Sequence, residues 1–235
     1  MNALTPAASA ATEATFTISR YPSALIDVRT LRDHTRLTLR PVLPQDDALL
    51  ADLIGRVSRA SLRNRFHGAV NGVSASRLAR MTCVDYRHHF AFVVTTLEGG
   101  RETIIADARY CVDDDANDPR CGSGCGGSAE FALLVDDRWH RRSLGAWTLA
   151  ALAEAACGAG LTWLHGDVLA GNLPMLALLQ RGGFCCTPDP ADDRLVRAEK
   201  RLHAARSPAP HERRLAWLPR WLAGGLAAAP APRLQ

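Results

Sequence analysis

Residues 136–147, DDRWHRRSLGAW, directly follow the apolar run FALLV and combine acidic, basic and small side chains. His140, Arg141 and Arg142 precede a Ser-Leu-Gly turn, and an Ala/Leu-rich stretch comes after it. A helix that starts at this turn leaves backbone N–H groups unpaired and carries a partial positive charge at that end. These donors favour a phosphate or pyrophosphate ligand. The alternative is a solvated arginine cluster ahead of a helix, because the turn matches neither the P-loop nor the dinucleotide-binding fingerprint.

Glu130 is the only acidic residue within the apolar stretch AEFALLV that precedes this turn. A carboxylate in a mainly apolar cleft has its pKa raised toward neutrality, so it can act as a general base. The alternative is a surface glutamate paired with an arginine such as Arg109. His165 and Asp167, in the stretch LTWLHGDVL, are reserve candidates for a base.

The cysteines do not predict a metal site. Cys121 and Cys125 flank GSG, and Cys185 and Cys186 are adjacent. Neither pair has zinc-ligand spacing, and no nearby histidine completes a site. Seven cysteines are an odd number in a chain without an export signal, so free thiols are expected.

The length and composition predict one globular domain without a membrane span. The chain has 235 residues, of which 47% are hydrophobic, and no stretch approaches the ~20 apolar residues that cross a bilayer. With no secretory signal at the N-terminus, we expect a cytoplasmic protein. The formal charge of +4 comes from the tail after residue 205, which holds five arginines and one glutamate, so the remainder is neutral. Neither a basic face nor a helix-turn-helix pattern points to nucleic acid.

Hydrophobic periodicity alternates between two and 3.6 residues, which predicts a mixed α/β domain. Residues 35–42 alternate like an edge strand, and residues 44–66 predict a helix. Two strand-like runs meet at Glu98-Gly99-Gly100, which predicts a hairpin. Residues 129–169 predict a strand-helix-strand crossover with parallel strands. Asn172 is expected to cap the next helix, and residues 193–202 alternate as a closing strand.

The order of these elements resembles the GNAT superfamily of acyl-CoA-dependent N-acetyltransferases. HRRSLG stands at the family's pyrophosphate motif, with His140 where Gln or Arg is usual and Ser143 in place of the first glycine. GDVLAGNLPMLALLQRGGF resembles the family's fifth strand and the helix after it, with Asn172 at the usual cofactor-contacting place. LRNRFHG and MTCVDYRHHFAFVV are similar to the Pat-type protein lysine acetyltransferases in particular.

This resemblance implies a GNAT-like mixed, mostly antiparallel sheet with a central, splayed parallel strand pair and flanking helices. It implies acetyl-CoA as cosubstrate, with the pantetheine arm against the strand backbone and Glu130 as the general base. Leu179 stands where many members carry a tyrosine acid, so that group is excluded. The implied cofactor contacts are Leu133, Leu134, Val135, His140, Arg141, Arg142, Ser143, Leu144, Gly145, Ala146 and Asn172.

We therefore expect an N-terminal extension over residues 1–34, an acetyltransferase domain over 35–205 and a Pro/Ala/Arg-rich tail over 206–235. The leading hypothesis is acetyl transfer from acetyl-CoA to a protein lysine. A small-molecule amine acetyltransferase is the enzyme alternative, and loop acids such as Asp113 and Asp118 could supply its acidic pocket. A non-catalytic acyl-CoA sensor is the third hypothesis, motivated by the departures at His140 and Ser143. The acceptor, the preferred acyl group and the oligomeric state do not follow from the sequence.

Overall fold

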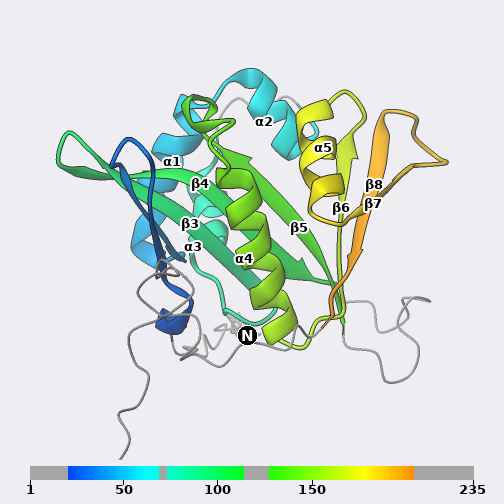
Figure 1. Ribbon diagram of the computed structural model, residues 1–235, viewed down its shortest axis with the longest axis horizontal. Coiled ribbons are helices and arrows are strands. Elements are labelled where there is room, and N and C mark those ends of the chain that lie inside the picture. The colour runs from blue at the N-terminus through cyan, green and yellow to red at the C-terminus, as the bar shows by residue number, and fades with distance from the viewer. Residues whose placement is uncertain (1–20, 69–72, 114–126, 204–235) are drawn as a thin grey trace, which may run out of the picture. The chain divides into compact units, whose positions relative to one another are not determined.

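The computed structural model describes residues 21–68, 73–113 and 127–203. They contain one eight-stranded sheet in the order β1-β2-β3-β4-β5-β6-β8-β7 (Figure 1). Only β5 and β6 run parallel, and every other neighbouring pair is antiparallel. This confirms the mixed sheet with one parallel pair. The strands are β1 (Asp27–Thr30), β2 (Arg36–Pro41), β3 (His89–Glu98), β4 (Arg101–Val112), β5 (Ser128–Val135), β6 (Trp163–Leu169), β7 (Cys185–Pro188) and β8 (Leu195–Arg201).

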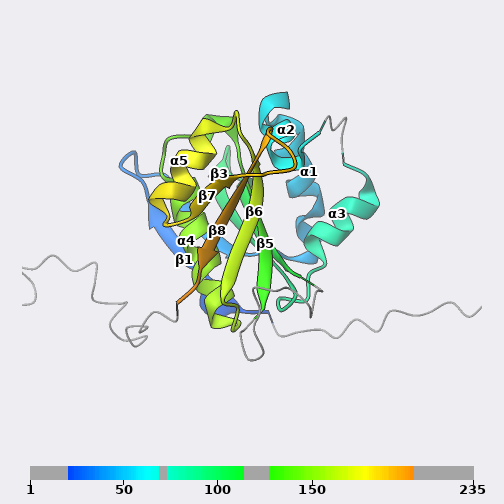
Figure 2. The ribbon, with the colours of Figure 1, turned by 90° about the vertical axis from the view of Figure 1, so that its right-hand side faces the viewer.

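Helices cover both faces of this sheet. The first face carries α4 and α5, and the second carries α1, α2 and α3 (Figure 2). Each face has its own apolar core: Leu152 of α4 packs with Phe131 of β5 in one, and Leu53 of α1 packs with Leu134 of β5 in the other. The helices are α1 (Asp47–Arg56), α2 (Arg59–Phe66), α3 (Ala75–Thr82), α4 (Leu144–Gly158) and α5 (Leu173–Arg181).

The parallel strands part soon after they meet. Their register covers only three pairs, from Ser128 with Trp163 to Glu130 with His165. Beyond this point β5 still pairs with β4, and β6 still pairs with β8. The backbone of β5 therefore has an edge without a strand partner between Phe131 and Val135, as the expected splay requires.

The single helix expected over residues 44–66 is wrong, because the chain breaks between α1 and α2. Val57 is extended, and the Ser58 side chain accepts a hydrogen bond from the N–H of Ser61, which caps a new helix. The apolar positions at helical spacing end at Val57, and α2 is mainly polar with no buried residue.

The strand over residues 36–41 is also not at the edge of the sheet. It lies between β1 and β3, and its outer partner β1 comes from the segment expected to be an extension. β8 likewise lies inside, because β7 pairs along its outer side. The hairpin at Gly99-Gly100 is confirmed, with both glycines at positive φ.

Candidate active site

The start of α4 has no side-chain cap. This helix has 15 residues, and its uncapped start contrasts with α2, α3 and α5, which Ser58, Ser74 and Asn172 cap. Its first turn holds no acidic residue. The first N–H groups of a helix lack intrahelical partners, so they remain available to a ligand here.

The three basic residues ahead of α4 have different partners. His140 Nε2 lies 3.0 Å from the carbonyl oxygen of Val135 and donates to it, which ties the loop to the end of β5. Arg142 pairs with Asp33 at 3.1 Å and lies over the ring of Trp139. Arg141 is exposed and has no hydrogen bond or ion pair to any other described residue. Arg141 is thus the side chain best placed to receive an anion.

The backbone around the helix start is tight. Ser143 adopts a left-handed conformation with φ 62°, and Arg141 has φ 58°. A side chain at Gly145 would place its Cβ 3.0 Å from Leu178 Cδ2 and 3.6 Å from Leu133 Cδ2. The absence of a side chain at Gly145 therefore lets α4 begin close to both β5 and α5.

The remaining residues of the expected cofactor site lie beside this start. Leu144 is buried, and Ala146 is exposed. Leu134 is buried toward α1, whereas Leu133 and Val135 face the core under α4. Asn172 accepts a hydrogen bond from the N–H of Met175 at 3.4 Å and so begins α5. Leu179, at the position of the excluded tyrosine, is fully buried.

Glu130 lies on the face of the sheet that carries α1 to α3. Ala129 and Phe131 point into the core under α4, so the alternation of side chains places Glu130 on the opposite face with Leu134. The carboxylate is exposed, in contrast to the apolar cleft expected from the sequence. The expected alternative pairing with Arg109 is absent among the described residues, because Arg109 contacts Asp107 through two nitrogens and donates to the carbonyl of Met81.

Arg65 of α2 is half-buried and lies within electrostatic range of Glu130, which the sequence did not predict. Burial lowers the pKa of this guanidinium to about 10, while the charges of Asp107 and Glu130 act in the opposite sense. Its Nε is buried without a hydrogen-bond partner in the described chain. Asp107 is thus the main charge partner of Arg65, and Glu130 has a smaller effect.

His165 lies beside Glu130 on the neighbouring strand, and its ring is hydrogen-bonded to Asp113. Its Nε2 is 2.6 Å from Asp113 Oδ2, and the Ser128 hydroxyl donates to the same oxygen at 2.5 Å. A carboxylate accepts hydrogen bonds, so Nε2 donates to Asp113. The Nδ1 atom of His165 is buried and has no partner among the described residues. The other reserve candidate, Asp167, pairs with Arg197 at 3.2 Å.

Asp137 connects the loop before α4 to the start of α2. It lies in a one-turn 3-10 helix, Asp137–Trp139, between β5 and the α4 loop. Its carboxylate accepts hydrogen bonds from the N–H of Ser58 at 2.7 Å and from the hydroxyls of Ser58 and Ser61 at 2.9 and 2.6 Å. The start of α2 is therefore fixed to the loop that precedes α4.

The described residues contain no group of three or more possible metal ligands. Cys121 and Cys125, together with Asp114 to Asp118, lie outside the described residues. In the same described part of the chain, no helix has the length and hydropathy needed to cross a membrane.

Comparison with known proteins identifies the architecture. No protein-family model matches the sequence. Acetyltransferase Pat of Mycolicibacterium smegmatis is 32% identical over 145 residues, which is 62% of this chain and 40% of the relative. The GNAT domain of S. lividans PAT superposes with a TM-score of 0.66 at 26% identity, covering 77% of this chain and 99% of that domain. This chain has the fold of a GNAT domain and resembles the GNAT domain of a Pat-type acetyltransferase.

A more distant GNAT-type fold is that of a Salmonella typhimurium protein solved with its cofactor acetyl-CoA. It has a TM-score of 0.55 at 16% identity and covers 74% of this chain and 98% of that one, so it supports the fold alone. The chain spans 40% of the length of the curated Pat relative. The resemblance is therefore limited to the acetyltransferase-domain part of the Pat relative.

Proposed function

We propose that this GNAT domain transfers an acetyl group from acetyl-CoA to the ε-amine of a protein lysine, with Glu130 as general base. The observation that carries the proposal is the parting of β5 and β6 directly beyond Glu130 and His165. One end of this opening meets the uncapped start of α4, and the other end meets a carboxylate. The relative named acetyltransferase Pat supports the acetyl transfer but not the acceptor or the base.

The residues present fit the cofactor. The pyrophosphate of coenzyme A would be held by the N–H groups of Ser143 to Ala146 and by Arg141, because anions bind where helix N–H groups are unpaired. The unpaired edge of β5 from Leu133 to Val135 would hold the amide groups of the pantetheine arm. Acetyl-CoA supplies the acetyl group as a thioester, and the coenzyme leaves as a thiol.

The acceptor amine must lose a proton before it can attack, because the pKa of a lysine ammonium is about 10.4. Glu130 takes this proton directly or through a water molecule, since its exposed carboxylate faces the acceptor side and has no competing hydrogen bond within the described chain. Nitrogen then bonds to the acetyl carbon as the carbon–sulfur bond breaks. His165 lies next to Glu130 on the neighbouring strand and has no role in the proposed proton transfer.

A thiol-release assay tests this proposal. The protein is incubated with acetyl-CoA and, in parallel, with lysine-containing peptides and a panel of small amines. Faster release with the peptides supports the protein-lysine reaction, and release only with small amines supports the small-molecule alternative. Calorimetric binding of acetyl-CoA without turnover of any acceptor would contradict catalysis and favour the acyl-CoA sensor.

A further inference from the structure

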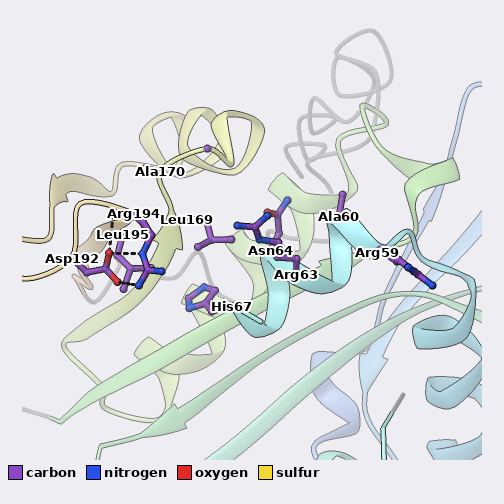
Figure 3. A pocket seen from close by; sticks show the side chains of 11 residues that line it. Arg59, Ala60, Arg63, Asn64, His67, Leu169, Ala170, Asp192, Arg194 and Leu195 are labelled. Atoms are coloured by element: carbon purple, nitrogen blue, oxygen red, sulfur yellow. Dashed lines mark hydrogen bonds and ion pairs between the residues drawn. The ribbon is translucent and has the colours of Figure 1, made fainter. Parts of the chain in front are cut away.

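A groove of about 880 Å³ lies between α2 and the far end of β6 (Figure 3). One wall is the outer side of α2, and the other is formed by the end of β6 and the segment that enters β8. Figure 3 shows Asn64 and His67 on the side of α2 toward Leu169, whereas the Arg59 side chain extends away from it. The lining residues are Arg59, Ala60, Arg63, Asn64, His67, Leu169, Ala170, Gly171, Asp192, Arg194 and Leu195.

The groove carries an excess of positive charge. Arg59 and Arg63 are exposed and form no ion pair with any described residue. Asp192 is the only acid in the lining, and Arg194 neutralises it through two hydrogen bonds of 2.9 and 2.7 Å. His67 adds a further positive charge when it is protonated. An anionic partner therefore gains favourable electrostatic energy in this groove.

The groove lies on the acceptor side of the candidate site. The helix that forms its wall also carries Arg65, which interacts electrostatically with Glu130. On the opposite wall, β6 runs from His165, beside Glu130, to Leu169 in the lining. Four residues of strand span about 13 Å, and an extended peptide advances ~3.3–3.6 Å per residue. The groove is thus about three to four peptide residues away from an amine at Glu130.

We infer that this groove binds acidic side chains located about three to four residues from the acceptor lysine of a protein substrate. The inference rests on the proposed function and adds a substrate class to it. The cofactor phosphates already have a place at the start of α4, on the face opposite α2. Carboxylates of the acceptor bind to Arg63 and thereby orient the lysine toward Glu130.

A matched peptide series tests the inference with the full chain. Each peptide has one lysine, and the positions three and four residues to either side are Glu, Gln or Lys. We expect kcat/KM to be about threefold higher for the Glu peptide than for the Gln peptide at low salt, because an exposed ion pair with Arg63 gives a small gain. The preference should shrink in 0.5 M NaCl, since salt screens exposed charges.

The variant Arg63→Glu should remove most of this preference and leave the KM for acetyl-CoA unchanged. Arg80→Glu is the matched control, because Arg80 is also an exposed helical arginine but lies on α3, outside the groove. Equal rates for all three peptides would overturn the inference while leaving the proposed function intact. A raised KM for acetyl-CoA in Arg63→Glu would assign the groove to the cofactor and also overturn it. If no peptide reacts at all, both the proposed function and the inference fail.

Discussion

Glu130 and His165 are paired in register on the two parallel strands, and they form the last pair before the strands part. Their side chains lie on the face that carries α2, and the Asp113 carboxylate holds the His165 ring through Nε2. This relationship places an exposed carboxylate and a buried imidazole at the closed end of the opening. The chemistry proposed for this domain depends on that position.

His165 is expected to contribute to stability through its buried hydrogen bond. Replacing it with alanine leaves a cavity and removes a partner of Asp113, so the free energy of unfolding should fall by about 1–3 kcal/mol. His88→Ala is the matched control, because His88 forms an exposed pair with Asp85 and should cost less than ~0.5 kcal/mol. Urea denaturation of both variants measures the difference. Equal losses would show that the His165–Asp113 contact does not stabilise the fold.

Ser143 stores strain that glycine would relieve. A left-handed conformation costs a residue with a Cβ roughly 1–2 kcal/mol, and part of this gain is offset by the greater chain entropy of unfolded glycine. Ser143→Gly should therefore stabilise the domain by about 0.5–1 kcal/mol without weakening acetyl-CoA binding. Ser143→Ala keeps the strain and should show no gain. Thermal unfolding of the three proteins decides, and identical midpoints for Gly and Ala would argue against strain at this residue.

Asp137 should make the link between α2 and the α4 loop sensitive to acid. Burial alone would raise the pKa of this carboxyl, but hydrogen bonds from Ser61 and Ser58 outweigh burial and lower the pKa below 3.8. Its stabilising effect is thus complete above the unfolded value and is lost as the pH falls through the lower folded value.

The variant Asp137→Asn should accordingly lose about 1–2 kcal/mol at pH 7, and this loss should shrink below about pH 4. Asp52→Asn changes an exposed acid on α1 and serves as the control. Denaturation curves across this pH range provide the measurement. A loss that stays constant down to pH 3 would contradict an ionised Asp137 as its cause.

Gly166 should be intolerant of a side chain because the parallel strands are close there. A Cβ at this position would lie 3.1 Å from both the carbonyl oxygen and the ring of Phe131. The backbone oxygen cannot move without shifting β5, so Gly166→Ala should cost about 1–3 kcal/mol. Gly171→Ala, where a Cβ meets nothing within 4 Å, should be nearly neutral. If the two variants have the same denaturation midpoint, the close approach of β5 and β6 is not rigid.

Local sequence patterns were sufficient for the elements around the splay. The apolar run of β5, the Ala/Leu-rich stretch of α4 and the cap at Asn172 are short-range signals, and each element formed as expected. The break before α2 was missed because its cap is fixed by Asp137, which lies 79 residues further along the chain. Periodicity carries no information about such a distant partner.

The same limit applies to the site. The places of Ser143 at a helix start and of Glu130 in a strand follow from local patterns, whereas their roles rest on the family resemblance and stay predictions. The approach of Arg65 to Glu130 and the bond from Asp113 to His165 join residues from different elements, so no local pattern indicates them. A basic residue within the polar face of a helix has no sequence signal that separates a buried arginine from a solvated one.

The variant Glu130→Gln tests the proposed chemistry most directly. It keeps the size and polarity of the side chain but removes the base, so kcat with a lysine peptide should fall about 10²–10⁴-fold. The loss should diminish as the pH approaches 10, because the amine then deprotonates without a base. The dissociation constant for acetyl-CoA, measured by calorimetry, should stay within about twofold of the parent value. A variant that retains its kcat at pH 7, or that loses acetyl-CoA binding in parallel with turnover, would contradict Glu130 as the general base.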